Sequence, residues 1–411
     1  MDVQLDETQT TAIKRCLDTR YRIVTVSGPA GSGKTTIAKS IYKAFTEAGY
    51  IVALSAPTGR AARRQSEVTG LPASTNHKLL EFPNPGDVDP ITGKAPPPGM
   101  PKRTKHNPLA ANVLLLDEGM MVDAEMYRYL IDALPAGGLL RVFGDRHQLK
   151  PINKTLGPPP FVALMNKFPT TELSTIHRQG AGSSIIANGA RIIEGKMPQR
   201  TEEFAIDVTD SPTNRLLADF ARNIDEFCST DHQIICPMRK PPAGTETINV
   251  LLQKFFQRGK DNVSITIPRA LKKEAPITFF VGDKVLINKN DYNLGVMNGD
   301  IGIVVGISEM GEIEVEFGWG KKIFPIVIET KSGSKIKRYD PRENISLGYA
   351  ITTHKAQGSE WESIYYVVPQ GTTYMANRTN FYTAITRARS YVKVFVTAQS
   401  FGASLRRERD E

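Results

Sequence analysis

The residues with the clearest chemical potential form the segment Gly28-Pro29-Ala30-Gly31-Ser32-Gly33-Lys34-Thr35, followed by Thr36. Glycines let successive backbone N–H groups close around phosphates, and a helix that begins directly after them points its positive dipole end at the same anion. We expect the Lys34 ammonium to reach the β- and γ-phosphates of a nucleotide, and the Thr35 hydroxyl to bind Mg²⁺. The segment therefore predicts a phosphate-binding loop.

Two carboxylates follow a second segment that fits the same site. Asp117 and Glu118 come directly after the apolar run 112–116, which is too short for an ordinary helix and indicates a buried parallel strand. Ligands of open α/β sheets bind at the carboxyl ends of strands. We expect Asp117 to hold Mg²⁺ through water, and Glu118 to orient or deprotonate the water that attacks the γ-phosphate.

An amide and two arginines complete the expected catalytic set. Gln148 follows the strand-like run 139–144, where it can sense the γ-phosphate. Arg178 and Arg387 lie far from the phosphate loop in sequence, in what reads as a second domain. Each is a candidate arginine finger, because a guanidinium that arrives from a body able to move relative to the loop can stabilise charge on the transferring phosphoryl group.

The elements that must position these residues alternate between strand and helix. An apolar β-branched run, Ile23 to Val26, precedes the phosphate loop, and a helix-like run from Thr36 to Ala48 follows it. This alternation continues to about Phe168 and predicts a parallel sheet covered on both faces. A second α/β region begins near Thr170. We expect it to have strands at 172–176, 233–236, 364–368 and 391–396, and helices near 184–194 and 248–256.

A proline-rich segment interrupts the first region. Residues 81–108 contain eight prolines, among them Pro96-Pro97-Pro98, so this stretch is neither a helix nor a central strand. A flexible loop and a small rigid insertion both fit the composition. Phe82, just before the prolines, is a candidate for stacking on a base.

Short strands and tight turns interrupt the second region between about residues 282 and 342. Strand patterns at 284–288, 300–307, 312–317 and 322–328 are separated by the turn signals Asn298-Gly299 and Met310-Gly311. This pattern predicts a small antiparallel barrel.

A series of ordered motifs together resembles those of superfamily 1 helicases, nearest the RecD-like and Dda-like group. The match covers nearly the whole length, and the matching segments are 5–9, 28–36, 53–63, 73–80, 117–118, 144–149 with Arg178, 349–361, and 382–389.

The resemblance implies an α/β fold with two RecA-like P-loop motor domains. We expect the first at 1–80 and 109–169 and the second at 170–282 and 343–411. It also implies a pin insertion that splits the duplex at 81–108, and an SH3-like β-barrel insertion at 283–342. ATP and Mg²⁺ are the implied cofactors. The residues that the resemblance assigns to the nucleotide are Gln9, which would read adenine, the loop 28–36, Gly358 and Glu360.

The same resemblance places nucleic-acid contacts on both motor domains. The expected contacts are Pro57, Thr58, Arg60, Thr75 and His77 in the first, and Thr353, His354 and Lys355 in the second. Hydroxyl, imidazole and ammonium donors near a helix start suit phosphate contacts. Helix-end residues of these types are also commonly satisfied by backbone groups, and both readings stay open for His77 and His354.

Two segments depart from the family pattern. Gly119-Met120-Met121 stands where the family has a small residue, serine and methionine, and His177 stands where an aromatic often stacks on the base. Neither departure touches the catalytic carboxylates or arginines. We therefore expect altered rate or nucleotide affinity with ATPase activity retained.

Composition agrees with a polyanionic partner. The 411 residues suggest two or more domains, and the formal net charge is +9, which favours nucleic acid and predicts salt-sensitive binding. The basic clusters 60–64 and 102–105 lie beside the expected nucleic-acid segments. The three cysteines have neither disulfide density nor zinc-site spacing.

No apolar run has the length of a membrane span, and the amino terminus lacks a signal-peptide pattern. We expect a cytoplasmic protein with no membrane partner, either bacterial or, if phage-encoded, in the host cytoplasm.

These observations predict an ATP-dependent DNA helicase that translocates on single-stranded DNA, 5′ to 3′ by resemblance, and unwinds duplex DNA. Single-stranded DNA and duplex junctions are the expected partners, with a single-strand-binding protein or a replisome component as a further one. Two alternatives stay open. One is a translocase or ATPase subunit of a larger DNA-processing complex, and the other is an RNA-directed superfamily 1 helicase.

Overall fold

The computed structural model describes residues 5–83, 99–151, 158–175, 183–240, 244–260, 262–269, 275–332, 335–369 and 375–407. The chain divides into two compact units. The first unit comprises residues 1–181 with 332–335, and the second comprises residues 182–331 and 336–411.

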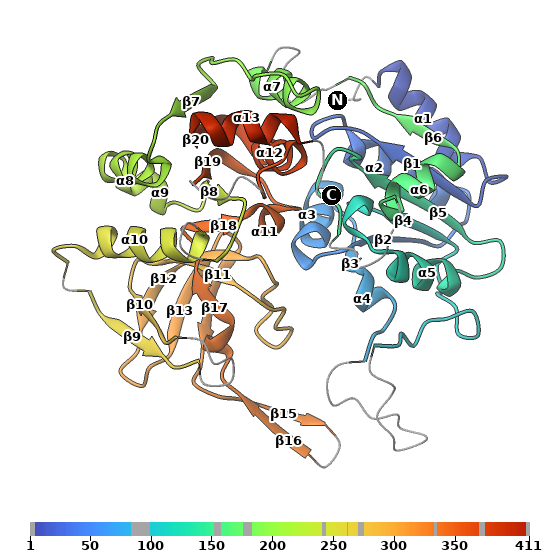
Figure 1. Ribbon diagram of the computed structural model, residues 1–411. Helices are drawn as coiled ribbons and strands as arrows, with labels where there is room; N and C mark the ends of the chain where they lie inside the picture. Colours follow the sequence, from blue (N-terminus) through green and yellow to red (C-terminus); the bar gives the residue numbers. More distant parts are fainter. Residues whose placement is uncertain are drawn as a thin grey trace. The chain divides into compact units, whose positions relative to one another are not determined.

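The first unit is built on a six-stranded parallel sheet (Figure 1). Its strand order is β3-β2-β4-β5-β1-β6. The strands are β1 (Ile23–Ser27), β2 (Val52–Ala56), β3 (Ala73–Thr75), β4 (Val113–Leu116), β5 (Leu139–Gly144) and β6 (Thr170–Glu172). The strand that carries the phosphate loop, β1, lies between β5 and β6.

Six α-helices and one 3₁₀ turn accompany this sheet in the described part of the first unit. They are α1 (Glu7–Leu17), α2 (Lys34–Glu47), α3 (Gly59–Thr69), α4 (Asn76–Leu79), η1 (Gly119–Met121), α5 (Ala124–Ala133) and α6 (Pro160–Lys167). Asp6, Thr58, Thr75 and Asp123 each accept a backbone N–H at the start of the helix they precede. Such a cap contributes about 1 kcal/mol.

Alternate residues of β4 belong to two different hydrophobic cores. Val113 and Leu115 pack with Ile37 and Phe45 of α2, whereas Leu114 and Leu116 belong to a cluster with Leu130 of α5. Successive side chains of a strand point to opposite faces of its sheet. Both faces are therefore covered, which explains why β4 is apolar at every position and confirms the expected two-sided parallel sheet.

A buried arginine closes the end of α1. Arg141 on β5 is fully buried, and its guanidinium donates to the carbonyls of Cys16 at 2.5 Å, Tyr21 at 3.0 Å and Asp18 at 3.2 Å. Burial lowers the pKa of Arg141 to about 10. Carbonyls at a helix carboxyl end lack partners within the helix, so this side chain fixes α1 to the sheet.

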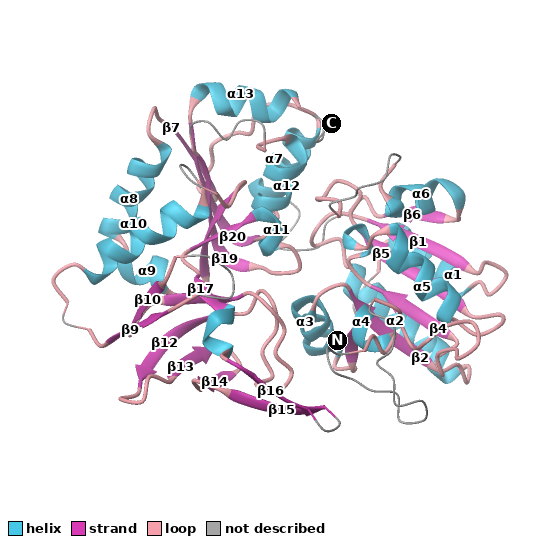
Figure 2. Ribbon diagram, turned by 60° about the horizontal axis from the view of Figure 1, so that its bottom comes forward, coloured by secondary structure: helices cyan, strands magenta, loops and turns pink. Residues whose placement is uncertain are grey.

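The second unit contains a five-stranded parallel sheet with the order β18-β8-β19-β20-β7. Figure 2 shows its strands in magenta with helices in cyan. The strands are β7 (Phe204–Val208), β8 (His232–Cys236), β18 (Ala350–Thr352), β19 (Trp361–Val368) and β20 (Ala388–Val396). The helices are α7 (Ser184–Ile193), α8 (Pro212–Arg222), α9 (Ile224–Cys228), α10 (Thr245–Gln257), α11 (Thr353–Ala356), α12 (Arg378–Ile385) and α13 (Ala398–Arg406).

The second unit also contains an antiparallel sheet with the order β14-β13-β12-β11-β17, here called the barrel sheet. Its strands are β11 (Lys284–Ile287), β12 (Ile301–Ile307), β13 (Ile313–Phe317), β14 (Gly320–Phe324) and β17 (Ile345–Leu347). Two antiparallel ribbons accompany it, and the 3₁₀ turn η3 (Pro341–Asn344) precedes β17. The ribbons are β9 (Ser264–Ile267) with β10 (Ile277–Phe280), and β15 (Ile328–Ser332) with β16 (Lys335–Tyr339).

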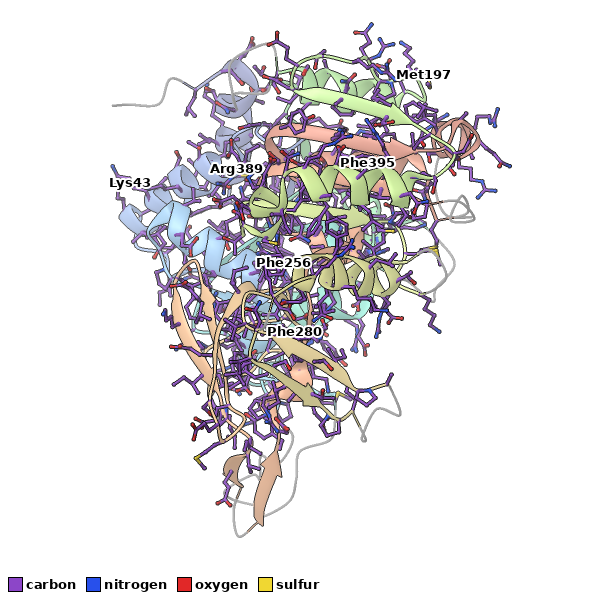
Figure 3. All side chains as sticks on the ribbon, turned by 90° about the vertical axis from the view of Figure 1, so that its left-hand side faces the viewer. Lys43, Met197, Phe256, Phe280, Arg389 and Phe395 are labelled. Carbon is purple, nitrogen blue, oxygen red and sulfur yellow. The ribbon has the colours of Figure 1, made fainter. Side chains whose placement is uncertain are left out.

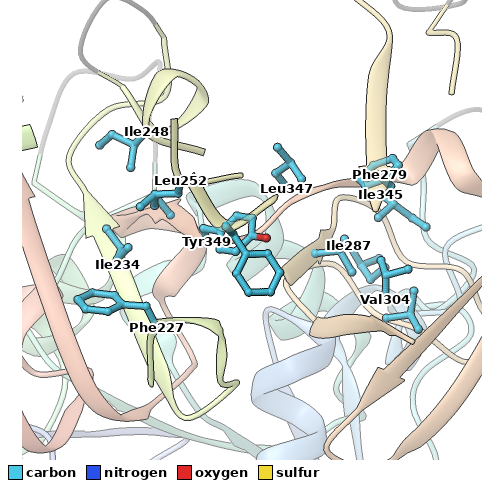
Figure 4. Packing of buried hydrophobic residues seen from close by; sticks show 14 of the residues in the cluster. Phe227, Ile234, Ile248, Leu252, Phe279, Ile287, Val304, Ile345, Leu347 and Tyr349 are labelled. Carbon is cyan, nitrogen blue, oxygen red and sulfur yellow. The ribbon is translucent and has the colours of Figure 1, made fainter. Parts of the chain in front are cut away.

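One continuous core joins the barrel sheet to the parallel sheet of the second unit. In Figure 4, Tyr349 lies among Leu252 and Ile234 from the α/β part and Ile287 from the barrel sheet. The Tyr349 hydroxyl donates to Asp283 over 2.9 Å. Phe256 and Phe395, labelled in Figure 3, belong to the same core. The barrel sheet therefore shares a packed core with the parallel sheet of the same unit.

Two expected domain boundaries are corrected by strand pairing. The strand expected at 172–176 in the second domain is Thr170–Glu172, and it pairs with β1 in the first sheet, so a boundary after residue 169 was wrong. The barrel was expected to end at residue 342, yet Ile345–Leu347 pairs with β11. Both pairings join residues far apart in sequence, where local patterns carry no signal.

Residues 84–98 of the proline-rich segment lie outside the described residues, but its two flanks are joined. The Arg103 guanidinium pairs with the Glu81 carboxylate at 2.5 Å, and the Arg103 N–H donates to the Leu80 carbonyl at 3.1 Å. The residues on either side of the segment, at 80–81 and at Arg103, are therefore held together.

Candidate nucleotide and nucleic-acid site

The carboxyl edge of the first sheet gathers the predicted nucleotide residues. Ser27 at the end of β1 is in register with Gly144 at the end of β5, and the Gly28 N–H donates to the Gly144 carbonyl over 3.0 Å. At the end of β4, the Asp117 N–H donates to the Ser55 carbonyl of β2 over 2.9 Å. The phosphate loop, the Asp117-Glu118 pair and the Gln148 segment thus follow neighbouring strands.

The phosphate loop has the backbone that its glycines predict. Gly31 and Gly33 both have φ of +82°, a region that favours glycine. At Gly28, a Cβ would lie 2.6 Å from Ser32 Oγ and 2.9 Å from Leu173 Cβ. The Lys34 ammonium donates to the carbonyls of Gly28 at 2.7 Å and Pro29 at 2.8 Å, which holds it over the loop.

Asp117 lies in an environment that disfavours its charge unless cations are near. Burial raises the pKa of Asp117, while the positive charges of Lys34 and Arg64 act in the opposite direction. Arg64 belongs to α3, the helix that begins beside the expected nucleic-acid contacts. No motif of the sequence predicted that Arg64 would lie close enough to affect this carboxylate.

Glu118 has a strained backbone. Its φ is +50° and its ψ +41°, a left-handed conformation that is uncommon for a residue with a side chain. Its N–H donates to the Asp117 carboxylate over 2.9 Å. Strain of this kind recurs at functional sites, where it fixes the direction of a side chain.

Gly119, the small residue at the start of the Gly119-Met120-Met121 segment, has a packing reason. A Cβ at this position would lie 2.4 Å from Val142 Cγ1 and 2.7 Å from the Tyr127 hydroxyl. The same hydroxyl donates to the Gly119 carbonyl over 2.8 Å. Any larger residue would displace the turn that follows Glu118, so glycine is required here.

Gln148 is held by Asp145. Its Nε2 donates to the Asp145 carboxylate over 3.2 Å, and both residues are buried. Gln148 Oε1 is buried with no hydrogen-bond partner among the described residues. A buried acceptor of this kind costs roughly 1–3 kcal/mol, so it fits a site where a ligand or water completes the bond.

Gln9 connects α1 to the phosphate loop. Its Oε1 accepts from the Asp6 N–H at 3.1 Å in a capping box, and its Nε2 donates to the Ser32 carbonyl at 3.1 Å. The predicted adenine-reading residue is therefore buried at the loop itself. Adenine recognition by Gln9 stays a prediction.

Two of the expected nucleic-acid hydroxyls are helix caps. Thr58 Oγ1 accepts from the Ala61 N–H, and Thr75 Oγ1 accepts from the Lys78 N–H, both at 3.2 Å. Thr58 follows β2 and Thr75 is the last residue of β3, so both lie at the carboxyl edge of the sheet. The neighbouring contacts Pro57 and Arg60 are half-buried.

His77 and Phe82 contact each other. Their ring centroids are 4.8 Å apart, and Phe82 also meets Tyr129 edge-on at 5.7 Å. Partial burial lowers the pKa of His77, and Asp123 acts in the opposite direction. Phe82 is half-buried against the core of the first unit, so it anchors the start of the insertion. Base stacking by Phe82 stays a prediction.

In the second unit, the three expected contacts at 353–355 differ in accessibility. Thr353 is fully buried and its hydroxyl donates to Asn380 over 2.6 Å, so its side chain is occupied inside the fold. His354 is half-buried. The Lys355 ammonium donates to Asn288 Oδ1 at 3.0 Å and Asn298 Oδ1 at 3.1 Å, both at the barrel sheet.

Arg387 is buried in the second unit. Its guanidinium donates to the carbonyls of Thr383 at 3.2 Å and Ser359 at 3.4 Å. Gly358 has φ of +75°, and Glu360 pairs with Arg389 at 3.7 Å. The second expected finger, Arg178, and the departure at His177 lie outside the described residues.

The described residues contain no group of three or more His, Cys, Asp or Glu that could hold a metal ion. Mg²⁺ is usually held by one or two carboxylates together with nucleotide phosphates, so it needs no such group. Binding of Mg²⁺ by Thr35 and Asp117 stays a prediction. Across the described ranges, no helix is long and apolar enough to cross a membrane.

Three family models match the chain in succession. They are an AAA domain over residues 4–207, the SH3 domain of ATP-dependent RecD-like DNA helicases over 248–317, and a UvrD-like helicase C-terminal domain over 347–395. The SH3 match begins in α10 and ends with β13. It confirms the expected SH3-like insertion.

Among curated relatives, the ATP-dependent RecD2 DNA helicase of Deinococcus radiodurans is 31% identical over 95% of the chain, which spans 49% of that relative. The RecBCD enzyme subunit RecD of Mycolicibacterium smegmatis is 26% identical over 98% of the chain and is covered to 73%. The chain thus spans about half the length of the RecD2 helicase.

Solved structures share the fold. The Pif1 helicase of Bacteroides in complex with ADP-AlF3 and single-stranded DNA is 22% identical, with a TM-score of 0.59 over 97% of this chain and 94% of that one. The Pif1 helicase of Candida albicans is 18% identical, with a TM-score of 0.57 over 98% and 96%. Over nearly its whole length the chain is similar to RecD-like DNA helicases, and the SH3 domain that it matches is the one named for them.

Proposed function

We propose that this chain is an ATP-driven DNA helicase that moves along single-stranded DNA and separates duplex DNA. One observation carries the proposal: Lys34, Asp117 and Gln148 meet at the carboxyl edge of a sheet whose neighbouring strands β2 and β3 also lead into the helices capped by Thr58 and Thr75. A nucleotide site and a candidate strand-binding edge thus share one rigid sheet.

Each residue at the nucleotide end has a proposed role. Backbone N–H groups of residues 28–36 and the Lys34 ammonium bind the phosphates, and Gln9 contacts the base. Thr35 and Asp117 hold Mg²⁺, which when bound neutralises charge on the β- and γ-phosphates. Glu118 accepts a proton from the attacking water, and Gln148 orients that water or the γ-phosphate.

Arg387 and Arg178 are the proposed arginine fingers. An arginine that stabilises charge on the transferring phosphoryl group accelerates phosphoryl transfer about 10³- to 10⁵-fold. The bonds from Arg387 to Thr383 and Ser359 hold its guanidinium beside the Gly358-Glu360 segment. Gly358 and Glu360 are further residues that we propose contact the nucleotide.

The proposed DNA contacts are Pro57, Thr58, Arg60, Thr75 and His77 in the first unit, and His354 and Lys355 in the second. The printed title of the Bacteroides Pif1 structure names single-stranded DNA as its ligand, which supports DNA as the polymer here. The net charge of +9 is consistent with it. The 5′-to-3′ direction rests on the family resemblance.

A second candidate is supported by the RecD relatives, whose name assigns them to a multisubunit enzyme. In that case the chain moves on single strands as one subunit and leaves strand separation to its partners. The proline-rich insertion distinguishes the two functions, because a helicase that acts alone needs its own device to divide the duplex.

The test uses two partial duplexes, one with a 5′ single-stranded tail and one with a 3′ tail, beside DNA-stimulated ATPase. Opening of the 5′-tailed duplex alone supports the proposal with its direction. Stimulated ATPase with neither duplex opened supports the translocase subunit. An ATPase rate that is stimulated by RNA but not by DNA would contradict DNA as the polymer on which the chain moves.

A further inference from the structure

The barrel sheet contributes two side chains that hold Lys355, the second unit's proposed phosphate contact. Lys355 Nζ donates to Asn288 Oδ1 at 3.0 Å and to Asn298 Oδ1 at 3.1 Å. Asn288 follows the end of β11, and Asn298 lies in the Asn298-Gly299 turn before β12. One loop of the barrel sheet, residues 288–300, therefore reaches the motif at 353–355 with two acceptors.

This loop is internally fixed. Asp291 is buried, and its carboxylate accepts the N–H groups of Asn293 at 3.1 Å and Leu294 at 3.2 Å and the hydroxyl of Tyr339 at 2.7 Å. The Asn298 N–H donates to Asn290 Oδ1 over 2.8 Å. The two amides that hold Lys355 are thus presented from a rigid support.

The chemistry of the acceptors matters as much as their position. An amide oxygen orients an ammonium group but carries no net charge, whereas a carboxylate would neutralise it. The loop also has two carboxylates, Asp291 and Asp300, and both are buried and accept backbone N–H groups of the loop. Two acceptors at the Lys355 ammonium, Asn288 Oδ1 and Asn298 Oδ1, are neutral amide oxygens.

We propose that Asn288 and Asn298 are positioning residues that hold the Lys355 ammonium for a phosphate of single-stranded nucleic acid. The proposal rests on the proposed function of Lys355. A lysine side chain loses rotamer freedom when it is immobilised, and two hydrogen bonds made before binding remove part of that cost.

The test compares isosteric charge variants by single-stranded DNA affinity across a salt series. Each phosphate contact on a single strand contributes about 0.7 to the slope of log affinity against log salt. We expect Asn298→Asp and Asn288→Asp to weaken binding and flatten the slope by up to about 0.7, as Lys355→Met does. Combining Asn298→Asp with Lys355→Met should add nothing to the effect of Lys355→Met.

Asn293→Asp is the matched control, since it places the same charge on the same loop away from Lys355. Asn293→Asp should change the slope of log affinity against log salt less than Asn288→Asp and Asn298→Asp do. Asn298→Ala removes the acceptor but keeps the lysine charge, so it should weaken binding with the slope retained. Unchanged thermal unfolding midpoints show that the variants fold.

Two outcomes would overturn the inference, and they are distinguishable. If Lys355→Met weakens binding but neither aspartate variant differs from Asn293→Asp, the amides do not position the lysine and the proposed function stands. If Lys355→Met itself has no effect, Lys355 is not a phosphate contact, and both this inference and that part of the proposed function fail.

Discussion

The side-chain amide of Gln9 donates to the carbonyl of Ser32 over 3.1 Å, which ties the first helix directly to the phosphate loop. The other end of the same amide accepts the Asp6 N–H in the capping box. Arg141 fixes the opposite end of this helix to β5. Gln9 therefore has a structural role and a proposed nucleotide role that substitutions can separate.

Gln9→Glu keeps an acceptor for the capping box but cannot donate to Ser32. Because the ionised carboxylate would be buried opposite the Ser32 carbonyl, we expect the unfolding midpoint to fall, while KM for ATP rises and discrimination against other nucleoside triphosphates weakens. Gln9→Ala loses both bonds and should also lose about 1 kcal/mol of stability. Steady-state ATPase with ATP and GTP, beside thermal unfolding, measures both. Equal KM values for the two variants and the unmodified chain would exclude a nucleotide role.

Asp117→Asn should separate stability from activity. Burial raises the pKa of this carboxyl in the folded state, so the folded protein binds its proton more tightly than the unfolded chain does. The ionised carboxylate thus costs stability at neutral pH, and this cost disappears as the pH falls through the raised value. We expect the variant to unfold at a higher temperature than the unmodified chain at pH 7, with the difference shrinking at lower pH.

Turnover by Asp117→Asn should fall at least about 10²-fold, because charge stabilisation at the transferring phosphate is lost. Measurements are made without nucleotide for stability and with Mg²⁺ and ATP for turnover. A variant that is both less stable at pH 7 and fully active would contradict the placement of Asp117 in a desolvated metal-binding position.

Glu118→Gln should bind ATP and stall before hydrolysis. The amide keeps the size of the side chain but cannot accept the proton of the attacking water, and general-base catalysis is worth roughly 10²- to 10⁴-fold. Single-turnover hydrolysis and nucleotide binding by fluorescence quantify the two steps. Rapid duplex unwinding by this variant would exclude Glu118 as the base.

Replacing residues 84–98 with a short glycine-serine link tests the insertion. The Arg103–Glu81 pair closes its base at 2.5 Å, so the two flanks need no further support from the removed residues. We expect DNA-stimulated ATPase to continue and unwinding to be lost if the insertion divides the duplex. Loss of both activities with a lowered unfolding midpoint would assign it a folding role instead.

The residues of the phosphate site could be predicted from the sequence, because each lies in a short local pattern. Residues 28–36, the run that ends at Asp117 and the strand before Gln148 each combine a buried strand with the polar group that follows it. Their parallel arrangement then brings them to one edge of the sheet. The barrel sheet was likewise recognisable from alternating residues and the Asn298-Gly299 turn.

Long-range partners were not predictable from local patterns. The pairing of Thr170–Glu172 with β1 moved a domain boundary. Arg141 reads as a surface charge within an apolar strand, yet it is fully buried by carbonyls from more than a hundred residues away. The Thr353 hydroxyl was expected to donate to a nucleic-acid phosphate, but it donates to Asn380 Oδ1 instead. The amides that hold Lys355 follow no motif.

The most direct test of the central claim is ATP-dependent unwinding of 5′-tailed and 3′-tailed duplexes by the unmodified chain and by Lys34→Ala. We predict that the unmodified chain opens only the 5′-tailed duplex. We expect Lys34→Ala to bind the tail normally but to lose turnover by about 10² or more. Lys34→Ala that hydrolyses ATP at the normal rate, or an unmodified chain with no ATPase in the presence of single-stranded DNA, would contradict the account.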